Sequence, residues 1–322
     1  MQSKKIRVVS IVIPARNEMC RIAAVIKAVA DQRNVDAAIE IIVVDDGSND
    51  DTAQIATDAG ARVIQPGGNQ VAGNPARARN IGARESRGDP LVFLDADCIP
   101  DPGWLATILA AHANHATIIG GALDLPPGLS LIARCDYYCG CYFIHSGRPA
   151  DFVPHHPPNN ISVRRAAFMS TSGFAECAPL NYTNEERHWQ AELQRADHKI
   201  YFEPAAIVCH YNRPGFGNLL RRSYRWGYTA LEAKSDTGAT RAAWIFARPK
   251  LLLMLAPIIP FALTAHIIAS WARAGVLEPI LMTPIILLTR IAYVAGMVVG
   301  GLRWLHAKDS REMQDRPSPR WQ

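Results

Sequence analysis

Over the first 125 residues, short apolar runs alternate with stretches of helical period. The run 41–44 is apolar at every position, which predicts a strand covered on both faces. Residues 18–30 instead repeat their apolar side chains every three to four positions, which predicts a helix capped by Asn17. The strands expected in this way are residues 8–14, 39–44, 62–64, 91–94, 118–121 and 201–210, and the expected helices are residues 18–30, 52–59, 76–85, 101–112 and 183–197.

This alternation of strands and helices predicts βαβ units, and hence an α/β fold with a Rossmann-like, mostly parallel sheet. Residues 126–182 break the pattern, because prolines and glycines recur there. We expect that segment to form loops and short strands that shape a pocket. Residues 215–248 are expected to form basic helices.

Two apolar stretches near the end of the chain are candidate membrane helices. Residues 251–271 contain no Asp, Glu, Lys or Arg, and such a stretch is long enough to cross a hydrocarbon core of about 30 Å. Residues 279–302 form the second candidate, which Arg290 interrupts. Because basic residues flank both outer ends, the positive-inside rule predicts a transmembrane hairpin over 251–303 with both ends in the cytoplasm. The alternative is a buried helical pair in a soluble domain, which two prolines in the first stretch and Arg290 in the second keep open.

The net charge is +5, and its placement is more informative than its size. Residues 213–250 hold eight Lys or Arg against two Asp or Glu, a local charge of +6 directly before the apolar region. This pattern predicts basic interfacial helices over 216–250 that meet the headgroups of membrane lipids. Nucleic acid is the competing partner for such charge, and we expect none because no nucleic-acid motif accompanies it.

The cysteines and the N-terminal residues indicate in which cellular compartment the first domain lies. Seven cysteines, an odd number without a second Cys/His cluster, argue against a complete disulfide framework and a zinc site, so we expect reduced thiols. The apolar run 8–14 is too short for the core of a signal peptide. We therefore expect a protein of the inner (cytoplasmic) membrane whose domain 1–215 faces the cytoplasm, with residues 304–322 as a polar cytoplasmic tail.

Acidic residues recur where the predicted strands end. They are Glu18 after the first strand, Asp45 and Asp46 after the second, and Asp95 and Asp97 after the fourth. Because the ligand crevice of an open α/β sheet lies outside the carboxyl ends of its strands, we expect these carboxylates to converge. Asp95 and Asp97 lie two residues apart on an extended segment, where they could reach a ribose hydroxyl and a divalent ion. Hard oxygen ligands suit Mg²⁺ or Mn²⁺.

Two details near the first acids narrow the choice of fold. Ser48, after the pair Asp45-Asp46, is a candidate helix N-cap, but a cap does not explain two adjacent acids. No G-x-G-x-x-G motif follows the first strand, so the usual dinucleotide-binding fold is not expected.

Four motifs then occur in order along the chain. They are IVIPARNE at 11–18, VDDGS at 44–48, ARNIG at 78–82 and FLDAD at 93–97. In this order they resemble the family 2 glycosyltransferases, which have the GT-A fold, and the similarity covers roughly residues 7–215. The resemblance implies a GT-A catalytic domain over 1–215 followed by C-terminal membrane helices.

The same resemblance implies which residues hold a nucleotide-diphosphate sugar. They are Pro14, Ala15 and Glu18 for the nucleoside pocket, Asp46 for the base, Arg79 near the nucleotide, Asp95 for the ribose or sugar, and Asp97 for the metal ion, Mg²⁺ or Mn²⁺. Arg79 has a second interpretation, as a charge on a helix surface.

The acceptor side of the family pattern is also present. It falls on residues 160–165, 172–176 and 185–186. The last pair stands where the family usually has Glu-Asp, whose Asp is the catalytic base, so the resemblance assigns the base to Glu186, with Glu185 as the adjacent alternative. Glu186 departs from that Asp by one methylene group. A structural interpretation is a capping box, with Thr183 as the cap and Glu186 at the third helical position.

Two further features resemble parts of the family. Arg222, Arg225 and Trp226 are similar to the Q-x-x-R-W signature of processive synthases, but Arg222 replaces the Gln, which favours a non-processive enzyme. An interfacial Arg/Trp helix beside the membrane is the alternative interpretation. His210 resembles a His that follows the last strand of these domains, where it could approach the metal or the diphosphate or simply lie in the core.

The implied activity is that of a metal-dependent, inverting hexosyltransferase. It would move a sugar from a nucleotide-diphosphate sugar, with a UDP-sugar favoured, to a hydroxyl of a membrane-associated acceptor such as a lipid-linked glycan. Two alternatives stay open at this point, a non-catalytic membrane partner that keeps the fold and a nucleotidyltransferase. The second is disfavoured because Asn17 and Glu18 stand where a Gly-rich phosphate loop would be needed.

Overall fold

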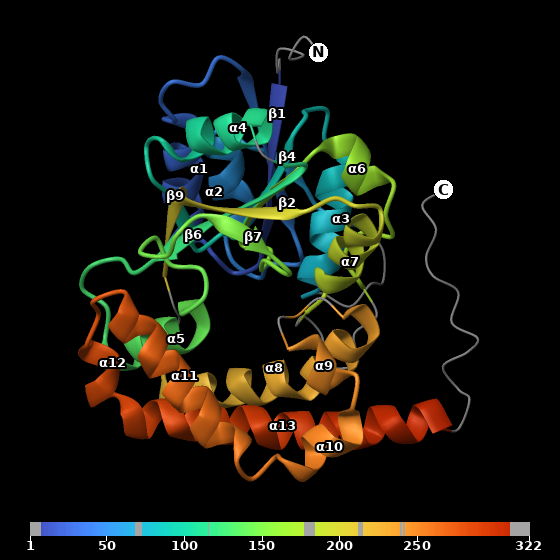
Figure 1. Cartoon of the computed structure of the whole chain (residues 1–322). Coiled ribbons are helices and arrows are strands. Elements are labelled where there is room, and N and C mark those ends of the chain that lie inside the picture. Colours follow the sequence, from blue (N-terminus) through green and yellow to red (C-terminus); the bar gives the residue numbers. More distant parts are fainter. Residues whose placement is uncertain are drawn as a thin grey trace.

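The computed structural model describes residues 8–67, 73–114, 116–176, 184–211, 215–238, 240 and 242–309. Figure 1 shows a sheet domain above a layer of C-terminal helices. The strands are β1 (Val8–Ala15), β2 (Ala38–Asp45), β3 (Arg62–Ile64), β4 (Leu91–Leu94), β5 (Cys98–Pro100), β6 (Ile118–Asp124), β7 (Asp151–Val153), β8 (Asn160–Val163) and β9 (Ile200–His210). The helices among them are α1 (Ile22–Ala30), α2 (Thr52–Asp58), α3 (Pro75–Glu85), α4 (Trp104–Asn114), α5 (Leu131–Cys141), α6 (Arg165–Met169) and α7 (Arg187–Arg195).

Within these residues, nine strands form one sheet in the order β3-β2-β1-β4-β8-β6-β9-β5, with β7 paired to β9. β8 runs antiparallel to β4 and β6, and β5 and β7 run antiparallel to β9, whereas the other six strands share one direction. The sheet is therefore mostly parallel, as the sequence predicts. The register sets Ala15 of β1 opposite Asp45 of β2, so the carboxyl ends of these strands lie level.

Apolar side chains cover both faces of this sheet. Ile22 of α1 and Trp104 of α4 belong to the cluster on one face. Phe168 of α6 and Trp189 of α7 belong to the cluster on the other. This double burial explains why strands such as β2 end in an unbroken apolar run.

Helix α1 begins later than expected. The prediction of a helix from residue 18 capped by Asn17 is wrong, because the helix starts at Ile22 after Arg21. The carbonyl of Glu18 accepts hydrogen bonds from the N–H groups of Arg21 and Ile22, so residues 18–21 form a turn. Asn17 has a positive φ of 55°, and its side-chain oxygen accepts from the N–H of Asn49 at 2.8 Å. Asn17 thus fastens two loops at the edge of the sheet.

The segment 126–182 is more regular than expected. It contains the helix α5, whose N-cap Ser130 accepts a hydrogen bond from the N–H of Ala133. The six cysteines within the described residues are free thiols, and Cys177 lies outside them.

The C-terminal layer contains six helices within the described residues. They are α8 (Phe216–Thr237), α9 (Ala243–Phe246), α10 (Pro249–Met254), α11 (Ile259–Arg273), α12 (Glu278–Leu281) and α13 (Thr283–Asp309). The prediction of one continuous helix over 251–271 is wrong, because Pro257 lacks an N–H and Pro260 opens α11, which has only 15 residues. In the described chain, one helix is long and apolar enough to cross a membrane, at Thr283–Ala307 with a mean hydropathy of 2.0.

Helices α8 and α13 lie side by side beneath the sheet domain (Figure 1). Glycines allow their backbones to touch. A Cβ atom on Gly227 of α8 would lie 1.8 Å from the carbonyl oxygen of Tyr293, and one on Gly296 of α13 would lie 2.0 Å from that of Tyr224. Such close approach is typical of helix pairs that pack through small residues.

We therefore expect Gly296→Val to destabilise the protein by about 1–3 kcal/mol, the usual cost of overpacking. The added side chain must push the backbone of α8 away. Gly217→Ala on α8 is the matched control, because a Cβ there meets nothing within 4 Å. Thermal unfolding of the detergent-purified chain measures both, and equal midpoints for the two variants would show that the contact does not hold the helices together.

Candidate active site

One cavity of about 770 Å³ is lined both by the carboxyl edge of the sheet and by side chains of α8 and α13. It brings together the whole set of predicted site residues. These are Pro14, Ala15, Glu18, Asp46, Arg79, Asp95, Asp97, Glu185 and Glu186. Four of the five strand-end acids expected to converge therefore line one pocket, whereas the fifth, Asp45, does not.

The two adjacent acids after β2 have different surroundings. Asp46 is buried and its Oδ1 lies 3.0 Å from Nη2 of Arg77 on α3. Burial raises the pKa of Asp46, and Arg77 opposes that rise. Asp45 instead holds a turn, because its side chain accepts hydrogen bonds from Ser48 and from Nε2 of Gln65. Only Asp46 lines the cavity, which explains why two acids stand together.

The turn after β2 shows that the prediction of Ser48 as a helix N-cap is wrong. Ser48 is not the N-cap of α2, which begins after Asp51. Its hydroxyl instead accepts from the N–H of Asn17 at 3.0 Å. Glu18 is fixed nearby, since its N–H donates to Oγ1 of Thr52 at 2.8 Å. These bonds hold the loop of Pro14–Glu18 in place at the mouth of the pocket.

Arg79 is buried in the site and forms ion pairs with two carboxylates. It is 3% exposed, so its interpretation as a helix-surface charge is wrong. Its Nη1 lies 3.0 Å from Oε1 of Glu185, and its Nη2 lies 2.5 Å from Oδ1 of Asp95. The guanidinium also stacks over the ring of Phe174, 5.5 Å from its centroid. Burial lowers the pKa of Arg79, but Asp95 and Glu185 outweigh burial and raise it, so Arg79 stays charged.

The pair Glu185-Glu186 is split between two partners. Glu185 is held by Arg79, whereas Oε1 of Glu186 contacts Nε2 of His155. Burial raises the pKa of Glu185 to about 7, Glu186 adds to the rise, and Arg79 opposes it. Burial also raises the pKa of Glu186, and burial together with Arg187 lowers that of His155 well below its ordinary value. A neutral imidazole thus faces a carboxyl group of raised proton affinity.

The capping-box interpretation of this pair is wrong for Glu186. Helix α7 begins at Arg187, so Glu186 stands at its N-cap rather than at the third helical position, and its side chain makes no cap hydrogen bond. The proposed cap, Thr183, lies outside the described residues. The side chain of Glu186 is therefore directed to His155 and the cavity.

A candidate metal site lies beside Asp97. Oδ1 of Asp97 is 3.5 Å from Nε2 of His210, and the thiol of Cys98 completes a group whose ligand atoms lie within 4.8 Å of one another. Burial, with Asp97 and Asp95, raises the pKa of Cys98 well above its ordinary value, so that sulfur stays protonated. A carboxylate oxygen and an imidazole nitrogen remain, a donor set that fits a divalent ion such as Mn²⁺ with a substrate diphosphate completing its shell.

The Arg/Trp segment of α8 lines this cavity as well. Arg222 forms an ion pair with Asp136 of α5 and lies 5.0 Å from the centroid of the Trp226 ring. Burial lowers the pKa of Arg222 to about 10, and Asp97 opposes the fall. Arg222, Arg225 and Trp226 therefore face the pocket, whereas the interfacial interpretation has them face the membrane.

Several residues of the pocket carry no signal that sequence reasoning used. They are Asp136, His155, Arg187 and Lys234, whereas Arg290 was noted only as a charge that interrupts an apolar stretch. Arg77 does not line the cavity but supports it through its ion pair with Asp46. The others belong to elements whose contact with the pocket depends on tertiary packing.

Comparisons with known proteins concern the domain that carries this site. Residues 10–166 match the family model "Glycosyl transferase family 2". Glycosyltransferase AglE of Haloferax volcanii is 28% identical over 228 residues, which cover 68% of this chain and 71% of that protein. The pre-mycofactocin glycosyltransferase of Mycobacterium tuberculosis is 28% identical over 239 residues, 70% of this chain but only 47% of that protein.

The fold has a counterpart among solved structures. The mannosyltransferase PcManGT of Pyrobaculum calidifontis, solved with GDP-Man and Mn²⁺, superposes with a TM-score of 0.60 at 18% identity, over 93% of this chain and 88% of that one. At this identity the likeness concerns the fold alone. With the ordered motifs and the pocket, the family match shows that the domain containing residues 10–166 belongs to the family 2 glycosyltransferases, and the described chain has the GT-A fold.

Proposed function

We propose that the protein moves a sugar from a nucleotide-diphosphate sugar to a hydroxyl of a membrane-associated acceptor, with inversion at the anomeric carbon. The observation that carries this proposal is the single cavity that joins the strand-end acids to the pair Glu185-Glu186. GDP-Man and Mn²⁺ in the structural neighbour PcManGT support a nucleotide sugar and a divalent ion. The preference for a UDP-sugar stays a prediction from the sequence.

The donor would lie along the carboxyl edge of the sheet. Pro14, Ala15 and Glu18 would line the nucleoside, Asp46 would accept a hydrogen bond from the base, and Asp95 would accept one from the ribose or the sugar. A metal ion held by Asp97 and His210 would supply positive charge where the leaving diphosphate gathers negative charge. Arg222, close enough to Asp97 to interact with it, would add to that stabilisation.

The acceptor proton would pass to Glu186. Of the two adjacent acids, Glu185 is already engaged by Arg79, while Glu186 faces a neutral His155. A carboxylate of raised pKa is a stronger base than an ordinary one, which suits removal of a hydroxyl proton during attack. Direct attack by the acceptor with one base, and without a covalent sugar intermediate, inverts the anomeric centre.

The C-terminal helices would place this site at the membrane. Their large exposed apolar side chains include Trp244, Leu251, Met254, Ile258, Phe261, Leu277, Ile280, Leu281, Leu288, Ile291, Val299 and Leu302. On α13 the exposed positions 284, 288, 291, 295, 299 and 302 follow helical spacing, so one whole face is apolar and outward. Such a face favours lipid contact. Because Arg248 and Lys250 precede the apolar C-terminal segment and Arg303 lies near its end, we propose that the catalytic domain lies on the cytoplasmic side of the inner membrane.

Metal dependence tests the proposed function. We expect Asp97→Ala, or removal of divalent ions with EDTA, to abolish donor-dependent release of nucleoside diphosphate by the purified chain. The reason is that the diphosphate loses its counter-cation. Asp58→Ala, at an exposed position of α2, is the matched control and should turn over normally. Turnover that survives both Asp97→Ala and EDTA would contradict the proposed dependence on a metal ion.

The base is tested by amide substitution. We expect Glu186→Gln to keep donor binding and lower kcat by about two to four orders of magnitude, the usual contribution of general base catalysis. Gln keeps the shape of Glu and can still contact His155. Glu185→Gln should reduce kcat less, although it weakens the ion pair with Arg79 and should lower the unfolding midpoint. A normal kcat in Glu186→Gln with a collapse in Glu185→Gln would instead assign the base to Glu185.

A further inference from the structure

The segment that follows β7 is fastened to helix α7 by two glutamines. Nε2 of Gln194 donates to the carbonyl oxygen of Pro154 at 2.9 Å. Gln190, which is fully buried, bonds the main chain of His156 twice, because its Nε2 donates to the carbonyl oxygen and its Oε1 accepts from the N–H. The N–H of Gln190 itself donates to the carbonyl oxygen of Glu186 at 3.3 Å. Gln190 therefore fixes this segment relative to the start of α7.

The ring of His156 is locked in the core. Its Nδ1 lies 2.9 Å from the carbonyl oxygen of Pro157, and its Nε2 lies 2.9 Å from that of Gly121. A Cβ atom on Gly120 would lie 2.2 Å from Cδ2 of this ring, so the glycine of β6 leaves room for the imidazole. The preceding side chain, His155, lines the catalytic cavity. Of the two adjacent histidines, one thus anchors the segment and the other belongs to the site.

His155 and Glu186 form a largely buried pair with few possible protonation states. Nε2 of His155 contacts Oε1 of Glu186. A base must begin as a carboxylate, and a carboxylate oxygen carries no hydrogen. The contact is then a hydrogen bond only if Nε2 carries the proton. The opposite arrangement, with the proton on Oε1 and a bare Nε2, would leave Glu186 without the charge that a base needs.

The groups around this pair favour a neutral imidazole. The charged and titratable side chains that act on it are Arg79 of α3, Arg187 of α7, Lys234 of α8, Glu185 and His156. Burial lowers the pKa of His155, and the nearby cations and the second imidazole lower it further. Burial raises the pKa of Glu186, and the two arginines oppose that rise. An imidazole of such low proton affinity does not take over the proton that Glu186 receives, so it stays a donor.

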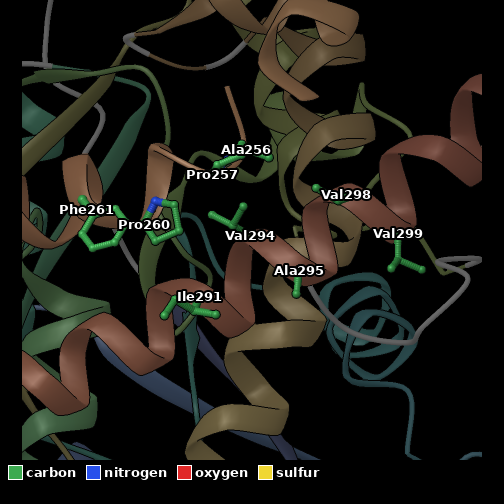
Figure 2. Close-up of a pocket in the computed structure, with 9 residues that line it drawn as sticks. All are labelled: Ala256, Pro257, Pro260, Phe261, Ile291, Val294, Ala295, Val298 and Val299. Carbon is green, nitrogen blue, oxygen red and sulfur yellow. The ribbon is translucent and has the colours of Figure 1, made fainter. Parts of the chain in front are cut away.

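The group that meets the second oxygen of Glu186 has to enter through the catalytic cavity. Another cavity, the apolar groove of about 510 Å³ in Figure 2, lies between the segment of Pro257 and Phe261 and helix α13. None of the residues that line this groove lines the catalytic cavity. Because His155 engages Oε1, Oε2 is the oxygen of Glu186 that can meet a hydroxyl in the catalytic cavity.

We propose that His155 positions the base: its Nε2–H donates to Oε1 of Glu186 and so directs Oε2 toward the acceptor hydroxyl. The inference rests on the proposed function, because it assigns a partner to the same base. In the reaction, the acceptor oxygen forms a bond to the anomeric carbon, the bond from that carbon to the diphosphate breaks, and the hydroxyl proton moves to Oε2. His155 keeps its own proton throughout. Fixing the orientation of a reacting group in this way accelerates its reaction.

The first test compares two substitutions of His155 in the full chain, purified in detergent micelles. Turnover is the release of UDP from UDP-glucose, or of GDP from GDP-mannose, with Mn²⁺ present. We expect His155→Leu to lower kcat by about ten- to a hundredfold at unchanged KM for the donor, because a hydrogen bond to a charged group is lost. His155→Gln, whose amide nitrogen can donate in its place, should recover most of the loss. Equal losses in the two variants would show that His155 does not act as a donor.

The pH profile of kcat separates this role from a structural one. Its acidic limb reports the protonation of the base. Removing a donor disfavours the charged carboxylate and raises its pKa, so the limb should move to higher pH by about one unit in His155→Leu. In His155→Gln and in His188→Leu, the matched control at an exposed histidine of α7, the limb should stay in place. A lower kcat with an unmoved limb in His155→Leu would show that His155 only supports the fold.

Combination with Glu186→Gln keeps this inference apart from the proposed function. If His155 acts through Glu186, then His155→Leu added to Glu186→Gln should lower kcat no further. Losses that multiply in the double variant would show that His155 acts elsewhere. A normal kcat in Glu186→Gln counts against the assigned base itself. A low kcat in Glu186→Gln together with a normal kcat in His155→Leu counts against His155 alone.

A direct measurement of the ring proton needs no turnover. With isotope-labelled histidine in the full chain, the NMR shifts of the ring nitrogens distinguish the two neutral tautomers from the charged imidazolium, and His155→Gln identifies the signal. At about pH 5.5, roughly one unit below the ordinary pKa of histidine, His155 should still be neutral with its proton on Nε2. A charged ring at that pH, or a neutral ring with its proton on Nδ1, overturns the inference.

Discussion

The ion-pair network of Arg79 is the interaction on which this site depends. Carboxylates from β1, β2, β4 and the segment before α7 line one cavity, and in a partly buried pocket such charges repel strongly unless a cation compensates them. Arg79, itself buried, meets Asp95 on the donor side and Glu185 on the acceptor side. It therefore ties the sheet edge to the segment 184–186, which leaves Glu186 free to face His155. The ion pairs of Arg79 thus both compensate the charges of the carboxylates and give the two adjacent glutamates different surroundings.

The second constraint comes from the C-terminal helices, which complete the pocket. Gly227 and Gly296 let α13 pack directly on α8, and α8 in turn carries Arg222 and Lys234 into the cavity. Helix α13 thus has two functional faces, one toward the catalytic pocket through Arg290 and one that is apolar and outward through residues such as Val299. The C-terminal helices therefore form one wall of the catalytic pocket.

Sequence reasoning found what is local and missed what depends on packing. The strands Arg62–Ile64 and Leu91–Leu94 have their predicted bounds, since short apolar runs between turns are strong signals. The strand-end acids were found for the same reason. Two prolines in 251–271 indicated the break between α10 and α11. The prediction followed the high hydropathy of this stretch instead, and so expected a single span. His155 and Arg290 could not be placed in the pocket, because only the fold brings the elements that carry them to it.

The central claim, that Arg79 balances the charges of both halves of the site, is tested most directly by a double-mutant cycle on stability. Arg79→Met should lower the free energy of unfolding by about 3–5 kcal/mol, because it leaves Glu185 buried without its partner. Adding Glu185→Gln to Arg79→Met should recover part of that loss, since the unpaired charge is then removed. A change of less than about 0.5 kcal/mol in Arg79→Met, or losses of the two substitutions that simply add, would contradict the account.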